Sequence, residues 1–185
     1  MSEVEELLKA YESFVRLPWD ESLSGQERVW FVVYDPTQER RIRLRVEEFE
    51  NITKKAGHTW QHLDLTDTFA QWMSQHKYRE AYFEEPEFLQ SALSAFTVAV
   101  ADQIKVVLSA IDVDENTVVA LTGLASLYGL TRVSETLEKV ISDLRGRLLV
   151  FFPGQRDGSN YRLLDARDGW NYLAVPITAN KWGVN

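Results

Sequence analysis

Short runs of apolar residues, set between longer stretches with helical periodicity, constrain the fold most strongly. Three of them cover residues 28–34 (RVWFVVY), 117–122 (TVVALT) and 147–152 (RLLVFF). Runs rich in β-branched and aromatic residues and bounded by polar turns are typical of strands that are buried on both faces. Residues 59–65 (TWQHLDL) alternate apolar and polar positions and add a further strand. Strands of this kind need helices on both sides, which predicts a largely parallel sheet.

Helical spacing of apolar residues fills the intervals between these strands. It predicts an amphipathic helix over residues 3–16, ending before Pro18, and one helix over residues 37–56, ending at Gly57. Further helices are expected from Thr66 or Asp67, from Pro86 to residue 111, and over residues 133–144. An aromatic and charged connector, residues 78–83, precedes the long central helix. These predicted helices alternate with the strands in the order that α/β domains show.

The C-terminal part reads as an antiparallel addition to this sheet. Pro153-Gly154 is expected to end the fourth strand, and residues 161–164 and 170–177 are expected to pair through a turn at residues 167–169.

The fold class predicted from these patterns is therefore α/β. We expect a single domain over residues 1–178, with a largely parallel sheet flanked by helices and a C-terminal antiparallel hairpin addition. Its topology would be Rossmann-like or degenerate P-loop-like, with the helix of residues 3–16 packed on it. Residues 179–185 are expected to form a tail.

Composition removes several classes of function. The chain of 185 residues has no cysteine and three histidines, which excludes disulfides, thiolate zinc sites and iron–sulfur ligation and disfavours histidine-rich metal centres. The formal net charge of −8 argues against a freestanding nucleic-acid binder, although one basic face remains compatible with it. The acidic N-terminus resembles no signal peptide, and no uninterrupted apolar run reaches the length of a membrane span, so we expect a cytoplasmic protein without membrane contact.

Two carboxylates suggest the main catalytic alternative. Asp35 and Asp64 follow predicted strands, and the carboxyl ends of parallel strands are where α/β folds bind ligands. Carboxylates at neighbouring strand ends would hold Mg²⁺, as a phosphohydrolase or nuclease requires. The competing interpretation is structural, because Asp35 before Pro36 suits a turn.

Other catalytic patterns are incomplete. Residues 123–131 (GLASLYGLT) lie between a strand and a helix, but no lysine occurs between Lys105 and Lys139, so they cannot form a phosphate-binding loop of the Walker type. His58 and His62 have the spacing of a zincin motif without its glutamate. No Gly-x-Ser-x-Gly elbow is present to support a Ser-His-Asp triad, and we expect no cofactor.

Arginines gather on the helix of residues 37–56 and near the C-terminus. Arg40, Arg41, Arg43 and Arg45 would contact DNA directly only if the neighbouring glutamates did not neutralise them through pairs three or four positions apart.

Residues 154–177 carry the richest mixture of interface-forming side chains. Tryptophan, tyrosine and arginine are the residue types that anchor protein interfaces. The alternative is that the charged residues here fix the hairpin by pairing with one another. The candidate partner-binding residues are Arg162, Asp165, Arg167, Asp168, Trp170 and Asn171.

Four segments together resemble a known family. They read FVVYDPTQERRIRLRVEEFENITKKAGHTW, REAYFEEPE, GRLLVFFPG and YRLLDARDGWNYLAVPI, and the match runs in order from about residue 4 to residue 178. In these segments the chain resembles the small B subunits (BrxB) of bacteriophage exclusion (BREX) systems, which protect bacteria from phages.

The resemblance implies an assembly or adaptor role in phage defence. In such systems a methyltransferase marks host DNA, and an alkaline-phosphatase-like Z protein, a large ATPase and other components act with it to block phage replication. The family supplies no catalytic residues to carry over to this chain. The leading expected partner is the Z protein, followed by the DNA methyltransferase and the large ATPase. Through these partners the chain is expected to reach DNA indirectly and to support host methylation and phage exclusion.

Overall fold

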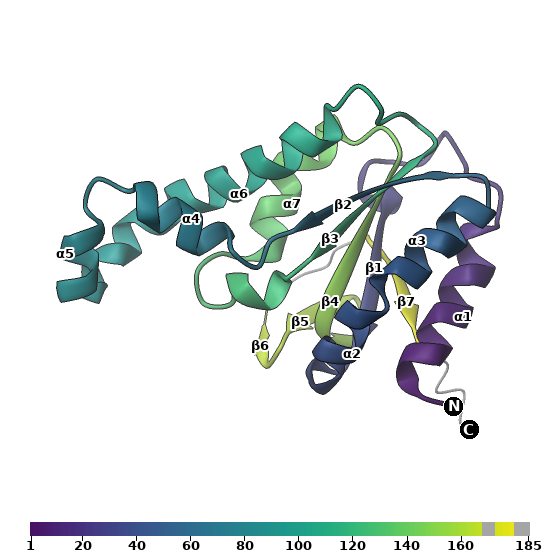
Figure 1. Ribbon diagram of the computed structural model, residues 1–185, viewed down its shortest axis with the longest axis horizontal. Helices are drawn as coiled ribbons and strands as arrows, with labels where there is room; N and C mark the ends of the chain where they lie inside the picture. Colours follow the sequence, from purple (N-terminus) through teal and green to yellow (C-terminus); the bar gives the residue numbers. More distant parts are fainter. Residues whose placement is uncertain (168–172, 180–185) are drawn as a thin grey trace.

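The computed structural model describes residues 1–167 and 173–179 and has the predicted α/β fold (Figure 1). Five parallel strands lie in the order β2-β3-β4-β1-β7, and β5 and β6 form an antiparallel extension of β4. The strands are β1 (Val29–Tyr34), β2 (Thr59–Asp64), β3 (Thr117–Thr122), β4 (Arg147–Asp157), β5 (Asn160–Leu163), β6 (Ala166–Arg167) and β7 (Val175–Thr178).

Helices fill the connections between these strands, as parallel pairing requires. The α-helices are α1 (Glu3–Val15), α2 (Glu39–Leu44), α3 (Val46–Lys55), α4 (Thr68–Gln75), α5 (Arg79–Glu84), α6 (Leu93–Leu108) and α7 (Val133–Val140). Short 3-10 helices are η1 (Gln26–Arg28), η2 (Pro36–Gln38), η3 (Pro86–Ala92), η4 (Leu124–Leu127) and η5 (Ile141–Asp143).

Both faces of the sheet are covered, because the central strands are apolar on both sides. All six residues of β1 are buried. Its side chains alternate: Val29, Phe31 and Val33 join the core beneath α6 and α7, whereas Trp30 and Val32 join the core beneath α1 and α3. The ribbon shows these helix pairs on opposite faces of the sheet (Figure 1). The apolar run of residues 28–34 therefore predicted burial on both faces correctly.

The expected helix over residues 37–56 is divided in the structure. Its residues form η2, α2 and α3, and Arg45, with φ −117° and ψ 11°, separates the two α-helices. The Arg45 guanidinium is held by Glu48, with Nε and Nη2 donating at 2.5 and 2.7 Å. Ile42, Val46, Phe49 and Thr53, which share one side of the predicted helix, are nevertheless buried, while Leu44 is 78% exposed. The break therefore leaves these four side chains packed inside the domain.

The C-terminal strands pair differently from the expectation. Residues 161–164 do not pair as a strand with residues 173–177, the described part of the predicted second strand. Instead β5 pairs antiparallel with β4, with Gly154 opposite Leu163, and β7 joins the parallel sheet beside β1. β4 continues through Pro153-Gly154, where it leaves β1 and enters the hairpin. The antiparallel addition thus exists, but it is built on β4.

One helical run, Pro86–Leu108, is long and apolar enough to cross a membrane by length and composition. Three acidic or basic residues interrupt it: Glu87, Asp102 and Lys105. Phe96, Val100 and Ile104, on its inner side, are fully buried in the core beneath α6 and α7. The α6 part of this run therefore packs against the core of the domain.

Gly154 is the residue on which the hairpin depends. A Cβ atom at this position would lie 1.8 Å from the backbone oxygen of Arg162, so no larger residue fits without displacing β5. We expect Gly154→Ala to lower the free energy of unfolding by about 2 kcal/mol, through overpacking.

Gly158, in the turn of the same hairpin, is the matched control for this substitution. It has φ +62° and open space around a Cβ atom, so Gly158→Ala meets conformational strain alone, worth about 1 kcal/mol. Urea unfolding of both variants measures the difference. An equal or smaller loss at Gly154 would contradict the close-approach explanation.

Candidate functional site

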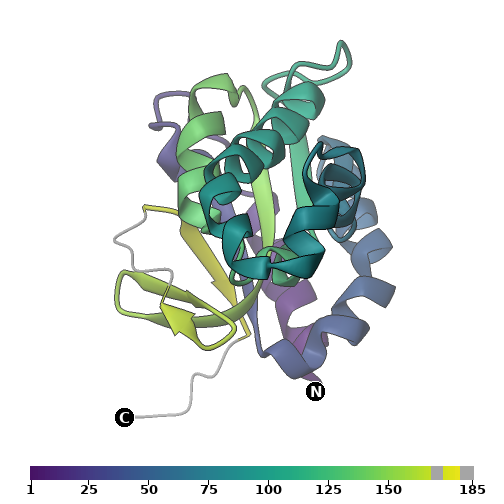
Figure 2. The ribbon, with the colours of Figure 1, turned by 90° about the vertical axis from the view of Figure 1, so that its left-hand side faces the viewer.

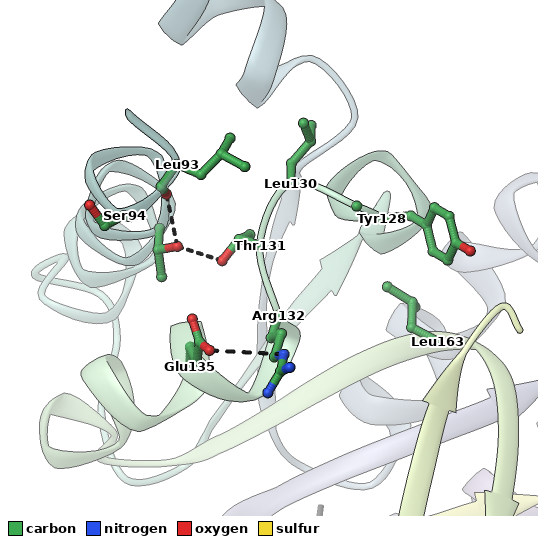
Figure 3. Close-up of a pocket in the computed structure, with 10 residues that line it drawn as sticks. Leu93, Ser94, Tyr128, Leu130, Thr131, Arg132, Glu135 and Leu163 are labelled. Atoms are coloured by element: carbon green, nitrogen blue, oxygen red, sulfur yellow. Dashed lines mark hydrogen bonds and ion pairs between the residues drawn. The ribbon is translucent and has the colours of Figure 1, made fainter. Parts of the chain in front are cut away.

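The candidate site is a cavity of about 410 Å³ at the carboxyl edge of the sheet (Figure 3). It lies where the N-terminal ends of α6 and α7 approach the loop of residues 128–132 and strand β5. Its lining residues are Leu93, Ser94, Thr97, Tyr128, Gly129, Leu130, Thr131, Arg132, Glu135 and Leu163. Three segments distant in sequence therefore build one cavity.

Hydroxyl pairing fixes the inner wall of the cavity. The Thr97 and Thr131 hydroxyl oxygens lie 2.6 Å apart, and the Thr97 hydroxyl also donates to the Leu93 carbonyl at 3.1 Å. At the mouth, Arg132 and Glu135 form an exposed ion pair at 4.0 Å (Figure 3). An exposed pair of this length stabilises little, which leaves both side chains available to a ligand.

Tyr128 connects the cavity to the hairpin. Its hydroxyl donates to the Asp165 carboxylate at 2.7 Å, and both side chains are exposed. This hydrogen bond, together with the negative charge of Asp165, raises the pKa of Tyr128, because both favour the protonated phenol. Asp165 thus positions an aromatic ring at the cavity wall.

Only some of the other predicted interface residues lie in the described part of the chain. Arg162 is in β5 and lies 3.9 Å from the exposed carboxylate of Asp157, so it keeps a weak partner within the hairpin. Arg167 contributes backbone to β6. Asp168, Trp170 and Asn171 lie outside the described residues. Of the six candidates, the structure brings Asp165 directly to the cavity and Arg162 to the strand that lines it.

The lining of the cavity suits binding better than catalysis. Its polar groups are hydroxyls, one guanidinium and one carboxylate, and no imidazole belongs to it. A serine or threonine nucleophile needs an adjacent base, and the hydroxyls of Thr97 and Thr131 are already paired with each other. Apolar walls with a few convergent polar groups are typical of ligand and peptide pockets.

The structure separates the two carboxylates of the metal hypothesis. Asp35 follows β1 and Asp64 ends β2, and strands β3 and β4 lie between these strands. Three strand spacings amount to about 14 Å, so the two carboxylates cannot share one Mg²⁺ ion. The expectation of neighbouring strand ends was wrong, because strand order is set by the whole sheet. Among the described residues, no group of three or more histidine, aspartate and glutamate side chains is placed to bind a metal.

Each of these carboxylates has a structural partner. Asp35 accepts hydrogen bonds from the Thr37 amide and hydroxyl at 2.8 and 2.6 Å, which caps η2. Asp64 accepts from Thr66 and from Arg43 Nη2, the latter at 2.6 Å. Partial burial would raise the pKa of Asp64, but the Thr66 hydrogen bonds and the Arg43 charge outweigh it and lower the pKa below its usual value.

The arginines on α2 and beside it are largely engaged within the domain. Arg43 pairs with Asp64 at 2.6 Å and Arg45 with Glu48 at 2.5 Å. Arg41 reaches the Gln38 side chain at 3.4 Å. Pairing of this kind dilutes the positive potential that direct DNA binding would need.

The two histidines of the 58–62 segment also have separate partners. His58 Nδ1 lies 2.6 Å from the Asn116 side-chain oxygen, and His62 Nε2 lies 2.8 Å from the Thr122 hydroxyl. Burial lowers the pKa of His62, which favours its neutral form.

A helical arm was not anticipated as a functional feature. α4, α5 and η3 extend from the carboxyl edge away from the sheet (Figures 1 and 2). Tyr78, Phe83 and Phe88 on this arm are 54%, 70% and 51% exposed. The sequence signal for this arm was the aromatic and charged connector of residues 78–83. Whether its aromatic side chains are exposed depends on tertiary packing, which the sequence pattern does not give. Exposed aromatics that lie near one another mark interaction surfaces.

Comparison with known proteins gives one match. A family model described as BREX protein BrxB matches residues 61–177, which is 117 of the 185 residues. This range contains the arm, the cavity lining and β5. No curated protein and no solved structure is significantly similar to the chain.

The Tyr128–Asp165 contact can be tested by titration. Asp165→Asn removes the negative acceptor, so we expect the pKa of Tyr128 to fall toward the ordinary tyrosine value. NMR of the tyrosine rings over a range of pH measures this, with Tyr128→Phe to assign the signal. Asp157→Asn removes the other hairpin carboxylate and serves as control. The same Tyr128 titration in both asparagine variants would show that the contact is absent in solution.

Proposed function

Because the chain belongs to the BrxB family of BREX proteins, we propose that it is a non-enzymatic adaptor that binds the alkaline-phosphatase-like Z protein of its system. In this role it works in the cytoplasm and supports host DNA methylation and phage exclusion. The DNA methyltransferase and the large ATPase are further partners in the proposal. DNA is reached through these partners, in keeping with the net charge of −8.

One observation carries the proposal: the arm, the cavity and the hairpin lie next to one another. η3 of the arm runs directly into α6, whose first residues Leu93 and Ser94 line the cavity. Leu163 of the hairpin lines the opposite wall, and Asp165 holds Tyr128 beside it. We call this combined region the docking face.

The docking face has the chemistry of a protein interface. It offers exposed aromatic anchors on the arm, a concave apolar centre and a polar rim, which is the usual arrangement in specific interfaces. Acidic residues outnumber basic ones beside the aromatics of the arm: Glu80, Glu84, Glu85 and Glu87 against Lys77 and Arg79. A complementary partner surface would therefore present an apolar groove edged by lysine or arginine.

Binding of the Z protein tests the arm. We expect Phe83→Glu to weaken the complex by about 2 kcal/mol, roughly 30-fold in the dissociation constant, because an exposed aromatic anchor is lost and a charge is introduced. Co-purification of the chain with the Z protein, followed by calorimetry on the purified pair, measures the effect. Leu44→Glu is the matched control, because Leu44 is equally exposed on α2, outside the docking face.

A second substitution tests the hairpin part of the docking face. Asp165→Arg reverses a charge at an exposed position and is expected to weaken the same complex while circular dichroism stays unchanged. A folded wild-type chain that captures no Z protein would overturn the proposal. Equal binding by Phe83→Glu, Asp165→Arg and Leu44→Glu would show that the partner uses another surface.

A further inference from the structure

A second hollow, of about 610 Å³, lies at the opposite, amino-terminal edge of the sheet. Its residues sit at or just before the starts of β1, β2, β3 and β4 or in the segment after α1. It is lined by Trp19, Glu21, Arg28, His58, Glu115, Asn116, Arg145 and Arg147. We call this site the basic hollow, because three arginines from two segments distant in sequence converge on it.

Arg147, the first residue of β4, is a buried cation without an acidic partner. Its side chain belongs to a residue only 4% exposed, and no carboxylate of a described residue lies within ion-pair distance. It donates instead to the backbone oxygens of Gly146 and Asp20 at 3.3 and 3.1 Å. The faces of Trp19 and Trp30 lie 4.8 and 5.9 Å from its guanidinium carbon.

Burial of this charge is unfavourable in the unliganded chain. Desolvation, and then the neighbouring charge of Arg28, lower the pKa of Arg147 below its ordinary value, against a smaller opposing effect of Asp20. The Asp20 carboxylate is occupied by the Ser22 amide and hydroxyl at 2.8 and 2.6 Å. An uncompensated buried charge is costly, and an anion in the hollow would relieve that cost.

Arg28 and Arg145 leave further donors available. Arg28 donates to the backbone oxygens of Arg145 and Glu21 at 3.2 and 2.9 Å, while its Nε is buried and has no partner among the described residues. The exposed Arg145 side chain makes no hydrogen bond or ion pair with a described residue. A guanidinium carries five donors, so the pair retains unused N–H groups beside Arg147.

His58 forms a flat wall of the hollow. Its ring stacks on Trp19 with centroids 3.6 Å apart and planes 5° from parallel. Asn116 Nδ2 donates to the Gly57 backbone oxygen at 2.9 Å, which orients the Asn116 oxygen toward His58 Nδ1 at 2.6 Å. An amide oxygen only accepts, so Nδ1 must carry the proton and Nε2 is left without it in the neutral ring.

The charges around the rim limit the size of the ligand. Glu21 and Glu115 are exposed and form no ion pair with the arginines of the hollow. They would repel an extended polyanion such as duplex DNA while admitting a single anionic group between the guanidinium groups. A tetrahedral oxyanion accepts hydrogen bonds from several directions, which suits three guanidinium groups around one hollow better than a planar carboxylate does.

We propose that the basic hollow binds one phosphate group, either free phosphate or the terminal phosphate of a small phosphate monoester. Arg145 supplies donors from the open side, the buried Nε of Arg28 supplies a further donor, and Arg147 supplies charge from the buried side. The site is independent of the docking face, so its failure would leave the adaptor proposal unaffected.

Titration of the full chain with inorganic phosphate tests this site. NMR signals of the His58 ring and the Trp19 indole report on the hollow, at constant ionic strength balanced with chloride. O-phosphoserine and acetate are titrated in parallel. We expect both phosphates to shift these signals saturably and acetate to bind about tenfold more weakly. Tighter binding of phosphoserine identifies a monoester as the ligand, and tighter binding of free phosphate identifies the ion.

Arg145→Gln is the decisive variant, because this side chain has no structural contact to lose. We expect it to weaken phosphate binding about tenfold, as loss of a charged hydrogen bond does. Arg40→Gln, an exposed arginine on α2 outside both sites, is the matched control and should bind as the wild type does. The proposal is overturned if phosphate causes no saturable shift, if Arg145→Gln binds normally, if acetate binds equally well, or if short duplex DNA alone perturbs the hollow.

Discussion

Six register pairs join β1 to β4 in parallel, and both strands bury their side chains on both faces of the sheet within this region. Neither strand is stable in water until both faces are covered, which is why the chain supplies α1 and α3 on one side and α6 and α7 on the other. Parallel pairing also requires every connection to cross from one edge of the sheet to the other. Loops therefore gather at two opposite edges, where the docking face and the basic hollow lie.

The local pattern of apolar residues was sufficient to predict most helices and strands, but it did not predict the order of the strands in the sheet. The apolar run at residues 28–34 predicted a doubly buried strand because each side chain is apolar whichever face it meets. Strand order has no such local signature. Asp35 and Asp64 follow strands that looked like neighbours in sequence, yet β3 and β4 lie between them. Residues 175–178 likewise pair with β1, a strand about 140 positions earlier, so nearby turn residues could not reveal their partner.

The candidate site was predictable in part for a related reason. Interface-forming residue types pointed to the hairpin region, and Asp165 does meet the cavity wall through Tyr128. The local pattern did not give the exposure of Phe83, however, which is 70% exposed, whereas Phe96 is fully buried. Their difference arises from how far the arm extends beyond α6 and α7. Membership of the BrxB family connects this chain with a BREX system, which the residue patterns alone could not indicate.

β4 also sets the spacing between the two regions. Arg147, at its start, belongs to the basic hollow, and Gly154, where the strand enters the hairpin, lies opposite Leu163 of the cavity wall. Seven residues of extended chain separate these ends by about 23 Å, several times the reach of any direct contact. A phosphate group and a protein partner can consequently occupy the molecule together. Because sites this far apart without shared contacts act additively, their binding free energies should sum, and either occupant stabilises the folded chain by its own full amount.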